Sequence, residues 1–445
     1  MGVQSMGRVW APPILVVAPH RRHFQFVFKP LEKLAVVRHG SVAVVDVEID
    51  GAVDARHKPG LLLQTRAFLE EPGHASLLTL SSHLQECGIF YAHTSGCVSE
   101  WDAPPPSAAP RAAGERHIVL IGVGAIGFRH LQSLLNVRLP LRVSVVEISA
   151  DIRAAAEKAL SLDGASPLFR VQWLPSLDAL PAGARVDLAI VATTSFPRRS
   201  VVERLLAGFD VKALLLEKVL FPTVGDHAAV AALTQAQGVH AFVNVGRRHP
   251  WIAALRDKAK SPVRMVVTGS GWGLACNAVH LSDAFAFING AFEGISIDGA
   301  GLLPGFEPAK RDGYIELFGT LACTLPVPGR GTAVATLECL PNAQYSVLVE
   351  GACEEFTFSW RFSDNIVRIQ HLGEGAGGAV ELPFPMPMLS ATNHLLVEKI
   401  LAGRLADVPT LAEVNPPSAA MIQAFITHLQ AAGHPAAAAG VCPIT

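Results

Sequence analysis

Apolar positions along the chain form two successive patterns. From residue 117, short continuous apolar runs alternate with segments of helical spacing. The runs lie at 117–122, 141–148, 186–193, 212–217 and 240–246, and the first helical segments lie at 125–137 and 151–162. This alternation is typical of a parallel sheet with helices on both faces. We therefore predict a doubly wound α/β domain over residues 115–246.

The pattern changes at about residue 262, where longer β-type runs begin. They lie at 313–325, 332–340, 346–351 and 354–360, and helical spacing returns at 393–405 and 418–430. Before them, residues 273–288 have the character of an apolar helix that contains one histidine, His280. We predict a C-terminal α+β domain over residues 247–445, built on a large, mostly antiparallel sheet.

The first part of the chain is separated by a linker rich in proline and alanine at 101–116. Residues 24–28, 34–37 and 42–50 have the character of strands, and 61–71 that of a helix. We predict a small α+β accessory domain over residues 1–110, to which the sequence assigns no role.

Composition narrows the function classes. Hydrophobic residues make up 50% of the chain and charged residues 17%, with a net charge of −2. This balance supports large cores and gives no electrostatic reason to expect nucleic acid or an anionic membrane as partner. No apolar run reaches the roughly 18 to 20 residues of a membrane span. The seven cysteines are scattered and odd in number, which is typical of a reduced cytoplasmic protein.

One group of cysteines and histidines has to be weighed as a metal site. His83, Cys87, His93 and Cys97 lie within fifteen residues and offer the ligand types of tetrahedral zinc. Their spacing matches no common zinc module, so buried cysteines and surface histidines are the favoured interpretation. We predict no metal.

The first apolar run of the α/β domain leads into a glycine-rich turn. Gly122, Gly124 and Gly127 form a G-x-G-x-x-G motif between a strand and a helix. The glycines permit a tight turn, a close approach of a pyrophosphate and close packing of helix on strand. The N–H groups at the helix start, including those of Ala125 and Ile126, face the phosphates. The sequence therefore predicts a Rossmann-type dinucleotide site.

A carboxylate selects the form of the cofactor. Glu147 ends the second strand, twenty residues after Gly127, where a carboxylate accepts hydrogen bonds from the adenosine ribose. Its charge repels a 2′-phosphate and favours NAD, although nearby Arg153 keeps NADP as an alternative. A solvated strand end is the other interpretation of Glu147.

Taken together, these segments resemble the family of glucose–fructose oxidoreductase, inositol dehydrogenase and MocA, from about residue 116 to the C-terminal helices. "IGVGAIGFRH" is similar to the family's fingerprint and includes His130. "DLAIVATTSFPRRSVVERLLAGFDVKALLLEKV" resembles the stretch that ends in the family's Glu-Lys-Pro motif. "FVNVGRRHPWI" resembles the exit from the nucleotide domain, and "CNAVHLSDAF" the family's Asp-x-x-x-His helix.

The resemblance implies roles for the residues at the strand ends. Glu217 and Lys218 match the Glu-Lys pair, and the lysine lies near the nicotinamide and the reacting oxygen. Thr193 and Thr194 match positions that line the nicotinamide-ribose pocket. A surface lysine at a strand end is the alternative interpretation of Lys218.

Polar residues at the exit of the sixth strand are open to two interpretations. Asn244, Arg247 and Arg248 lie there, and an arginine in this place, Arg247 above all, suits a carboxylate or phosphate of the substrate. Salt bridges that join the domains are the other interpretation.

The sequence departs from the family pattern at three positions. Val219 replaces the proline after the lysine, and Arg198 stands where many members have a histidine. Cys276 occupies the place of the aspartate four residues before the histidine of the Asp-x-x-x-His helix.

His280 keeps the place of the family's acid/base group. The titration range of histidine suits proton exchange near neutral pH, and Asn277 offers a hydrogen bond to a substrate hydroxyl. Without the upstream motifs His280 would be a satisfied core histidine. Asp283, on nearly the same helix face, is expected to orient the helix or join a salt bridge.

We therefore expect a cytoplasmic NAD(P)-dependent oxidoreductase. Its nicotinamide exchanges a hydride with a secondary alcohol or ketone of a sugar, nucleotide sugar or cyclitol, while Lys218 and His280 handle the proton. The alternatives are reduction of a C=N bond at the same site and a non-catalytic NAD-binding regulatory protein. The resemblance also implies a homodimer or homotetramer that assembles through the open face of the C-terminal sheet.

Overall fold

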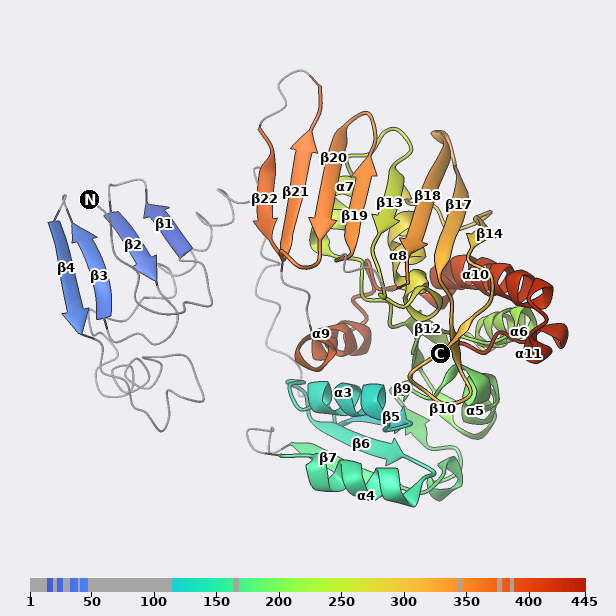
Figure 1. Ribbon diagram of the computed structural model, residues 1–445. Helices are drawn as coiled ribbons and strands as arrows, with labels where there is room; N and C mark the ends of the chain where they lie inside the picture. The colour runs from blue at the N-terminus through green and yellow to red at the C-terminus, as the bar shows by residue number, and fades with distance from the viewer. Residues whose placement is uncertain are drawn as a thin grey trace. The chain divides into compact units, whose positions relative to one another are not determined.

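The structure is a computed structural model of the chain (Figure 1). It describes residues 114–162, 168–341, 346–373, 378–384 and 388–445, together with the backbone of four strands earlier in the chain. The chain divides into two compact units, residues 1–105 and 106–445.

The described part of the N-terminal unit is an antiparallel sheet. Its strands are β1 (Ile14–Ala18), β2 (Arg22–Phe26), β3 (Lys33–Arg38) and β4 (Ser41–Asp46), paired in chain order. Three of them coincide with runs that the apolar pattern marks as strands. The helix expected at 61–71 lies outside the described residues.

The second unit begins with a parallel sheet of order β12-β11-β9-β5-β6-β7. Its strands are β5 (Arg116–Ile121), β6 (Leu141–Val146), β7 (Phe169–Leu174), β9 (Leu188–Val191), β11 (Ala213–Leu216) and β12 (His240–Val243). A minor parallel pair, β8 (Arg185–Val186) and β10 (Asp210–Val211), forms its own two-stranded sheet. The central strands β9 and β11 are buried along their whole length, because helices cover both faces.

The helices of this layer follow the strands in alternation. They are α3 (Ala125–Leu134), α4 (Ala150–Ala159), the 3₁₀ turn η1 (Leu177–Ala179), α5 (Ser195–Gly208) and α6 (Val224–Ala236). Two helices of the C-terminal part pack onto them: α9 (Leu389–Leu401) lies against α3, and α10 (Leu411–Ala431) against α6 (Figure 1).

The C-terminal part contains an eight-stranded sheet of order β14-β17-β18-β13-β19-β20-β21-β22. Its strands are β13 (Arg264–Thr268), β14 (Ser296–Leu302), β17 (Gly319–Val327), β18 (Gly331–Cys339), β19 (Leu348–Ala352), β20 (Phe356–Arg361), β21 (Ile366–His371) and β22 (Val380–Pro383). All neighbours are antiparallel except β13 and β18, which are parallel.

One face of this sheet is covered and the other is open. Along β17, every second residue is buried, as expected for a strand with one face in a core. The covering helices are α8 (Leu274–Asn289) and α10, which contact β17, β18 and β14 (Figure 1). The remaining short elements are α7 (Pro250–Arg256), β15 (Glu307–Pro308), β16 (Ile315–Glu316) and α11 (Pro435–Ala438).

These two layers confirm the predicted fold class, a parallel doubly wound sheet followed by a large, mostly antiparallel one. Among the described residues, no helix combines the length and apolar character that a bilayer span requires.

Candidate functional site

The glycine turn after β5 has the backbone that its motif demands. Gly122 has φ +84°, a conformation that side chains with a Cβ rarely adopt. A Cβ at Gly127 would lie 1.9 Å from the carbonyl oxygen of Gly122, so only glycine permits this packing of α3 on the turn. A Cβ at Gly124 would meet nothing within 4 Å. Gly124 therefore leaves open space at the start of α3, where a pyrophosphate has to approach.

Glu147 crosses from the end of β6 to this turn. Its carboxylate accepts hydrogen bonds from the backbone N–H of Val123 (2.9 Å) and of Ser149 (3.0 Å), and it is 8% exposed. It is therefore a fixed part of the turn and not a solvated strand end. Arg153 donates to the main-chain carbonyl of Glu147 at 2.7 Å, which ties its guanidinium to the same strand end.

The neighbouring strand end supplies an unsatisfied polar atom. Thr193 follows β9, and Thr194 is the N-terminal cap residue of α5 without a side-chain capping bond. Among the described residues, the Thr193 hydroxyl oxygen is buried with no hydrogen-bond partner. An orphaned hydroxyl at the carboxyl edge of the sheet, next to the open glycine turn, fits a ligand with ribose hydroxyls. The residues present thus fit a dinucleotide.

Glu217 is the centre of a buried network just beyond β11. Its Oε1 atom lies 2.6 Å from His130 Nε2 and 2.6 Å from Asn244 Nδ2. Asn393 Nδ2, on α9, lies 2.6 Å from the other ring nitrogen of His130. Burial would raise the pKa of Glu217, but the His130 and Asn244 hydrogen bonds and the charge of Lys218 hold that pKa below its ordinary value. Glu217 is therefore a fixed negative charge beside Lys218.

Arg198 holds the chain that follows Lys218. It is 1% exposed, donates to the carbonyl of Leu220 at 2.7 Å, and also donates to the carbonyls of Val219 and Thr193. Burial lowers its pKa to about 10, so the guanidinium remains charged at neutral pH. The peptide bond between Lys218 and Val219 is cis. The arginine that replaces the family's histidine thus fixes both the β9 and the β11 strand ends.

Lys218 reaches from the parallel sheet to α8. Its Nζ donates to the main-chain carbonyl of Cys276 at 3.1 Å, one helical turn before His280. Burial lowers the pKa of His280 well below its ordinary value, and the positive charges of Arg247 and Lys218 lower it further. Lys218 therefore lies within electrostatic reach of His280, although the two residues belong to different domains in the sequence prediction.

The state of His280 differs from the one that the sequence predicts. Its Nδ1 accepts a hydrogen bond from the backbone N–H of Gly246 at 3.3 Å, which leaves the proton of the neutral ring on Nε2. With its lowered pKa the ring is neutral at pH 7, whereas the sequence suggests proton exchange near neutral pH. Burial is the main cause of the lowered pKa, and the charges of Arg247 and Lys218 add to it. A neutral imidazole here donates a hydrogen bond through Nε2 and does not carry a charge.

Asn277, the polar neighbour of Cys276, has already used part of its hydrogen-bonding capacity. Its Nδ2 donates to the carbonyl of Trp272 at 2.6 Å. That contact orients the side-chain amide at the first turn of α8. The amide oxygen is the group that remains for a substrate hydroxyl.

The two arginines after β12 have different surroundings. Arg248 forms a bidentate pair with Asp283 (2.7 and 3.0 Å) and a further bond to Glu413 on α10 (2.8 Å), with a side chain 3% exposed. It joins α8 to α10, in agreement with the salt bridge expected for Asp283.

Arg247 makes no comparable pair. It donates to the carbonyl of Gly246 at 3.0 Å, its guanidinium lies 5.6 Å from the ring centre of Phe362, and burial lowers its pKa to about 10. Its Nε is buried with no partner among the described residues. Of the two, Arg247 is the one with capacity left for an anionic ligand.

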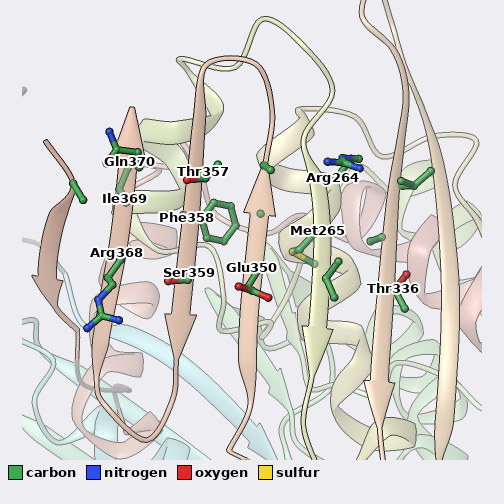
Figure 2. A pocket seen from close by; sticks show the side chains of 16 residues that line it. Arg264, Met265, Thr336, Glu350, Thr357, Phe358, Ser359, Arg368, Ile369 and Gln370 are labelled. Atoms are coloured by element: carbon green, nitrogen blue, oxygen red, sulfur yellow. The ribbon is translucent and has the colours of Figure 1, made fainter. Parts of the chain in front are cut away.

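A hollow of about 610 Å³ lies elsewhere, on the eight-stranded sheet. Figure 2 shows Arg264 on β13, Glu350 on β19 and Arg368 on β21 around it. None of the residues that the sequence assigns to catalysis or cofactor binding lines this hollow.

Sequence reasoning missed two residues that the structure brings to the site, Asn393 and Glu316. Glu316 accepts a hydrogen bond from the backbone N–H of Ala275 at 2.6 Å, next to the Lys218 contact. No local motif marks either residue. His83, Cys87, His93 and Cys97 lie outside the described residues, and the part that is described contains no group of histidine, cysteine and carboxylate side chains arranged for a metal.

Comparisons with known proteins agree with this geometry. Residues 116–245 match a family model, GFO_IDH_MocA, described as "Oxidoreductase family, NAD-binding Rossmann fold". No curated protein sequence matches the chain.

Solved structures share the fold at low sequence identity. The UDP-N-acetylglucosamine 3-dehydrogenase GnnA from Acidithiobacillus ferrooxidans superposes with a TM-score of 0.50 at 17% identity, over 70% of this chain and 96% of that one. An oxidoreductase from Agrobacterium radiobacter in complex with NAD+, L-tartaric acid and magnesium gives 0.51 at 14%, over 72% and 96%. A super-repressor mutant of Gal80p from Saccharomyces cerevisiae gives 0.54 at 11%, over 71% and 96%.

The glycine turn, the Glu217-Lys218 strand end and the histidine-bearing α8 were identified from the sequence as features of one family, and the family model covers the domain that carries the first two. Residues 116–245 are thus similar to the NAD-binding Rossmann domain of the Gfo/Idh/MocA oxidoreductases, and the whole second unit shares its fold with solved dehydrogenases.

Proposed function

We propose that the protein is an NAD(P)-dependent oxidoreductase that acts on a secondary alcohol or ketone of a sugar, nucleotide sugar or cyclitol. The observation that carries this proposal is the proximity of Lys218 to the turn of α8 that precedes His280. Lys218 extends from the carboxyl end of β11 to the carbonyl of Cys276, one turn before His280, and its charge lowers the pKa of His280. Open α/β sheets bind ligands at this edge.

The nicotinamide, when bound, supplies or accepts the hydride. Lys218 then holds the reacting oxygen and exchanges its proton, since a cation stabilises developing negative charge on that oxygen. His280, neutral at pH 7, donates a hydrogen bond through Nε2 to orient the same oxygen or its neighbour. Arg247 offers a guanidinium to a carboxylate or phosphate of the substrate. A UDP-N-acetylglucosamine dehydrogenase has this fold, so nucleotide sugars come first among the substrates to test.

We propose NAD as the preferred form of the cofactor. Each oxygen of the Glu147 carboxylate accepts one backbone N–H and keeps capacity for a ribose hydroxyl, and the fixed negative charge opposes a 2′-phosphate. Glu147→Ser should weaken NAD binding and reduce the difference in binding affinity between NAD and NADP. Calorimetric titration of both cofactors against both proteins tests this, and equal binding of NAD and NADP to the wild type would refute it.

The function is tested by a cofactor-reduction screen over sugars, nucleotide sugars and cyclitols. Lys218→Ala and His280→Ala should each lower kcat at least about a hundredfold, the range of acid–base contributions. Lys212→Ala is the matched control, because Lys212 lies at the opposite end of β11 and pairs with Asp210 on the surface. Turnover that survives both site substitutions would exclude the proposed site.

Two alternatives share parts of this site. Reduction of a C=N bond needs the same hydride and one proton donor, and a parallel screen with imines separates it from alcohol chemistry. A non-catalytic regulatory protein is the other alternative, favoured by the uncharged Cys276 in the helix motif and by the fold shared with Gal80p. It predicts NAD binding without turnover of any substrate and no effect of Lys218→Ala on that binding.

We also propose that the open face of the eight-stranded sheet joins copies of this chain into a homodimer or homotetramer. Val266 and Val334 are each 42% exposed on this face, beside the hollow of Figure 2. Exposed apolar residues on a broad flat sheet are suited to an interface between copies. Light scattering of the wild type and of Val334→Glu tests this, and a monomeric wild type would refute it.

A further inference from the structure

The carboxylate nearest to the first turn of α8 comes from a distant part of the chain. Glu316 ends the two-residue strand β16, and its Oε1 accepts from the backbone N–H of Ala275 (2.6 Å) and of Leu317 (2.9 Å). Gly273, the N-terminal cap residue of α8, has no side chain to do this. A Cβ built on Gly273 would lie 3.3 Å from Glu316 Oε2. One oxygen thus caps the helix, and the other faces the start of α8.

The charged and titratable groups around Glu316 come from three elements. They are Lys218 after β11, Cys276 on α8 and Cys339 on β18. Burial raises the pKa of Glu316, against the opposing effects of the two backbone hydrogen bonds, Cys276 and the charge of Lys218. Burial also raises the pKa of the Cys276 thiol, with Lys218 lowering it and Glu316 raising it. The pKa of the Cys276 thiol therefore depends on the charges of both Lys218 and Glu316.

Lys218 has two carboxylates within electrostatic reach, and they are not equivalent. Glu217 already accepts hydrogen bonds from His130 and Asn244 on one oxygen. The Lys218 amine donates to a neutral acceptor, the carbonyl of Cys276, at 3.1 Å. Glu316 lies beside that same carbonyl-bearing turn, with Oε2 outside the capping bonds. It is the carboxylate whose charge is placed to balance the amine.

We propose that Glu316 is the positioning carboxylate of this site, paired with Lys218 across the first turn of α8. The catalytic part of this inference rests on the proposed function. NAD, when bound, would accept the hydride from the substrate C–H bond in oxidation and return it in reduction. In oxidation the O–H proton would pass to Lys218 while its amine is unprotonated, as the C=O bond forms, and in reduction the Lys218 ammonium would return that proton. The negative charge of Glu316 would stabilise this ammonium across the first turn of α8, so that Glu316 acts through Lys218 and not on the substrate.

The position of Cys276 provides a rescue experiment. Its side chain begins on the turn where Lys218 and Glu316 converge, and it carries no charge. Glu316→Gln keeps an oxygen that accepts from Ala275 and Leu317 but removes the negative charge. Cys276→Asp returns a carboxylate to the same place from α8 itself. If Glu316 acts through its charge, adding Cys276→Asp to Glu316→Gln should restore the kcat that Glu316→Gln alone loses.

The first measurement needs no turnover. The pH dependence of iodoacetamide alkylation at Cys276, followed by peptide mass spectrometry in the full chain, reports the pKa of the thiol. Glu316→Gln should move the midpoint down by roughly one pH unit, and Lys218→Met should move it up. In the double variant Glu316→Gln, Lys218→Met the shift of the alkylation midpoint should differ from the sum of the two single shifts, because the effects of paired charges are not additive. Glu307→Gln removes an exposed carboxylate from β15, the strand paired with β16, and should leave the midpoint unchanged.

The second measurement uses a substrate found in the screen. Glu316→Gln should lower kcat about tenfold or more with the KM for NAD unchanged, and adding Cys276→Asp should restore most of the loss. Additive alkylation shifts would overturn the pairing, and a Glu316→Gln enzyme with wild-type kcat would overturn the positioning role. Coupled shifts in a protein that turns over no substrate would uphold the pairing and refute only the proposed function.

Discussion

His130 Nε2 lies 2.6 Å from Glu217 Oε1, in a contact that joins the helix after the glycine turn to the residue before Lys218. His130 is fully buried, and Asn393 on α9 bonds to its second nitrogen. Because an amide nitrogen can only donate, His130 Nδ1 accepts from Asn393 Nδ2, and His130 Nε2 donates to Glu217 Oε1. The network thus joins α3, the end of β11 that leads to Lys218, and α9 of the C-terminal part.

Glu217→Ala should destabilise the protein by about 3 kcal/mol or more, because His130 and Asn244 would lose their buried acceptor. Urea unfolding measures this. Glu203→Ala is the control, since Glu203 is 44% exposed and pairs with Arg199 on the surface, where such pairs contribute less than about 1 kcal/mol. Equal losses for the two variants would show that the network contributes nothing beyond an ordinary surface pair.

Two alanine substitutions in the glycine turn should affect different properties, one the stability of the fold and the other the affinity for NAD. Gly127→Ala places a Cβ 1.9 Å from a carbonyl oxygen and should cost about 3 kcal/mol of stability. Gly124→Ala meets nothing within 4 Å in the protein and has φ −60°, so the fold should be kept. Its methyl group should nevertheless weaken NAD binding about tenfold or more, because it occupies the space of the pyrophosphate.

Thermal unfolding and calorimetric titration of NAD separate these effects. A Gly124→Ala protein that binds NAD like the wild type would mean that the pyrophosphate does not lie against this turn. A Gly127→Ala protein of wild-type stability would mean that α3 packs differently on the strand.

Much of this architecture could be predicted because its signals are local. The apolar runs of β5, β9 and β11 and the glycine spacing lie within single segments, and Lys218 follows directly from its strand end. Glu316 and Asn393 could not be predicted in this way. Asn393 lies 263 residues from His130, and β16 is only two residues long, which is too short for a periodic pattern.

Two further differences have identifiable causes. The helical pattern places the last long helix at 418–430, after Pro416 and Pro417, whereas α10 begins at Leu411. A capping box between Thr410 and Glu413 starts the helix earlier, and the prolines are tolerated near its beginning. The low pKa of His280 comes first from its burial and then from the charges of Arg247 and Lys218, which only the tertiary structure brings near it.

The Arg248–Asp283 pair should show the cost of an uncompensated buried charge. Asp283→Leu or Arg248→Met alone should each destabilise the protein by about 3–5 kcal/mol. The first leaves the buried Arg248 with Glu413 as its remaining carboxylate partner, and the second leaves the fully buried Asp283 without its arginine. The double variant should be more stable than either single one, since neither buried charge remains and Glu413 is 34% exposed. Guanidinium unfolding of the four proteins gives the coupling energy, and a double variant with the summed loss would exclude a direct interaction.

His227 should make the protein sensitive to mild acid. This side chain of α6 is 1% exposed, its Nδ1 lies 2.7 Å from Asn415 Oδ1 on α10, and burial lowers its pKa from 6.5 to about 4. Between pH 6.5 and about pH 4, His227 is therefore protonated in the unfolded chain but not in the folded protein. The stability from this residue is complete above pH 6.5 and declines as the pH falls toward 4, by about 3 kcal/mol in total. Urea unfolding between pH 7 and pH 5 measures the decline.

The matched variants separate His227 from the other histidines. His227→Met removes the titrating group and should flatten the pH dependence by up to about 1.4 kcal/mol per pH unit, the value for one proton. His240→Gln changes an exposed histidine and should leave the wild-type slope intact. If the His227→Met protein loses stability toward acid as steeply as the wild type, the folded protein must accept a proton at His227 near its ordinary pKa, and the contact between α6 and α10 must open to water to allow it.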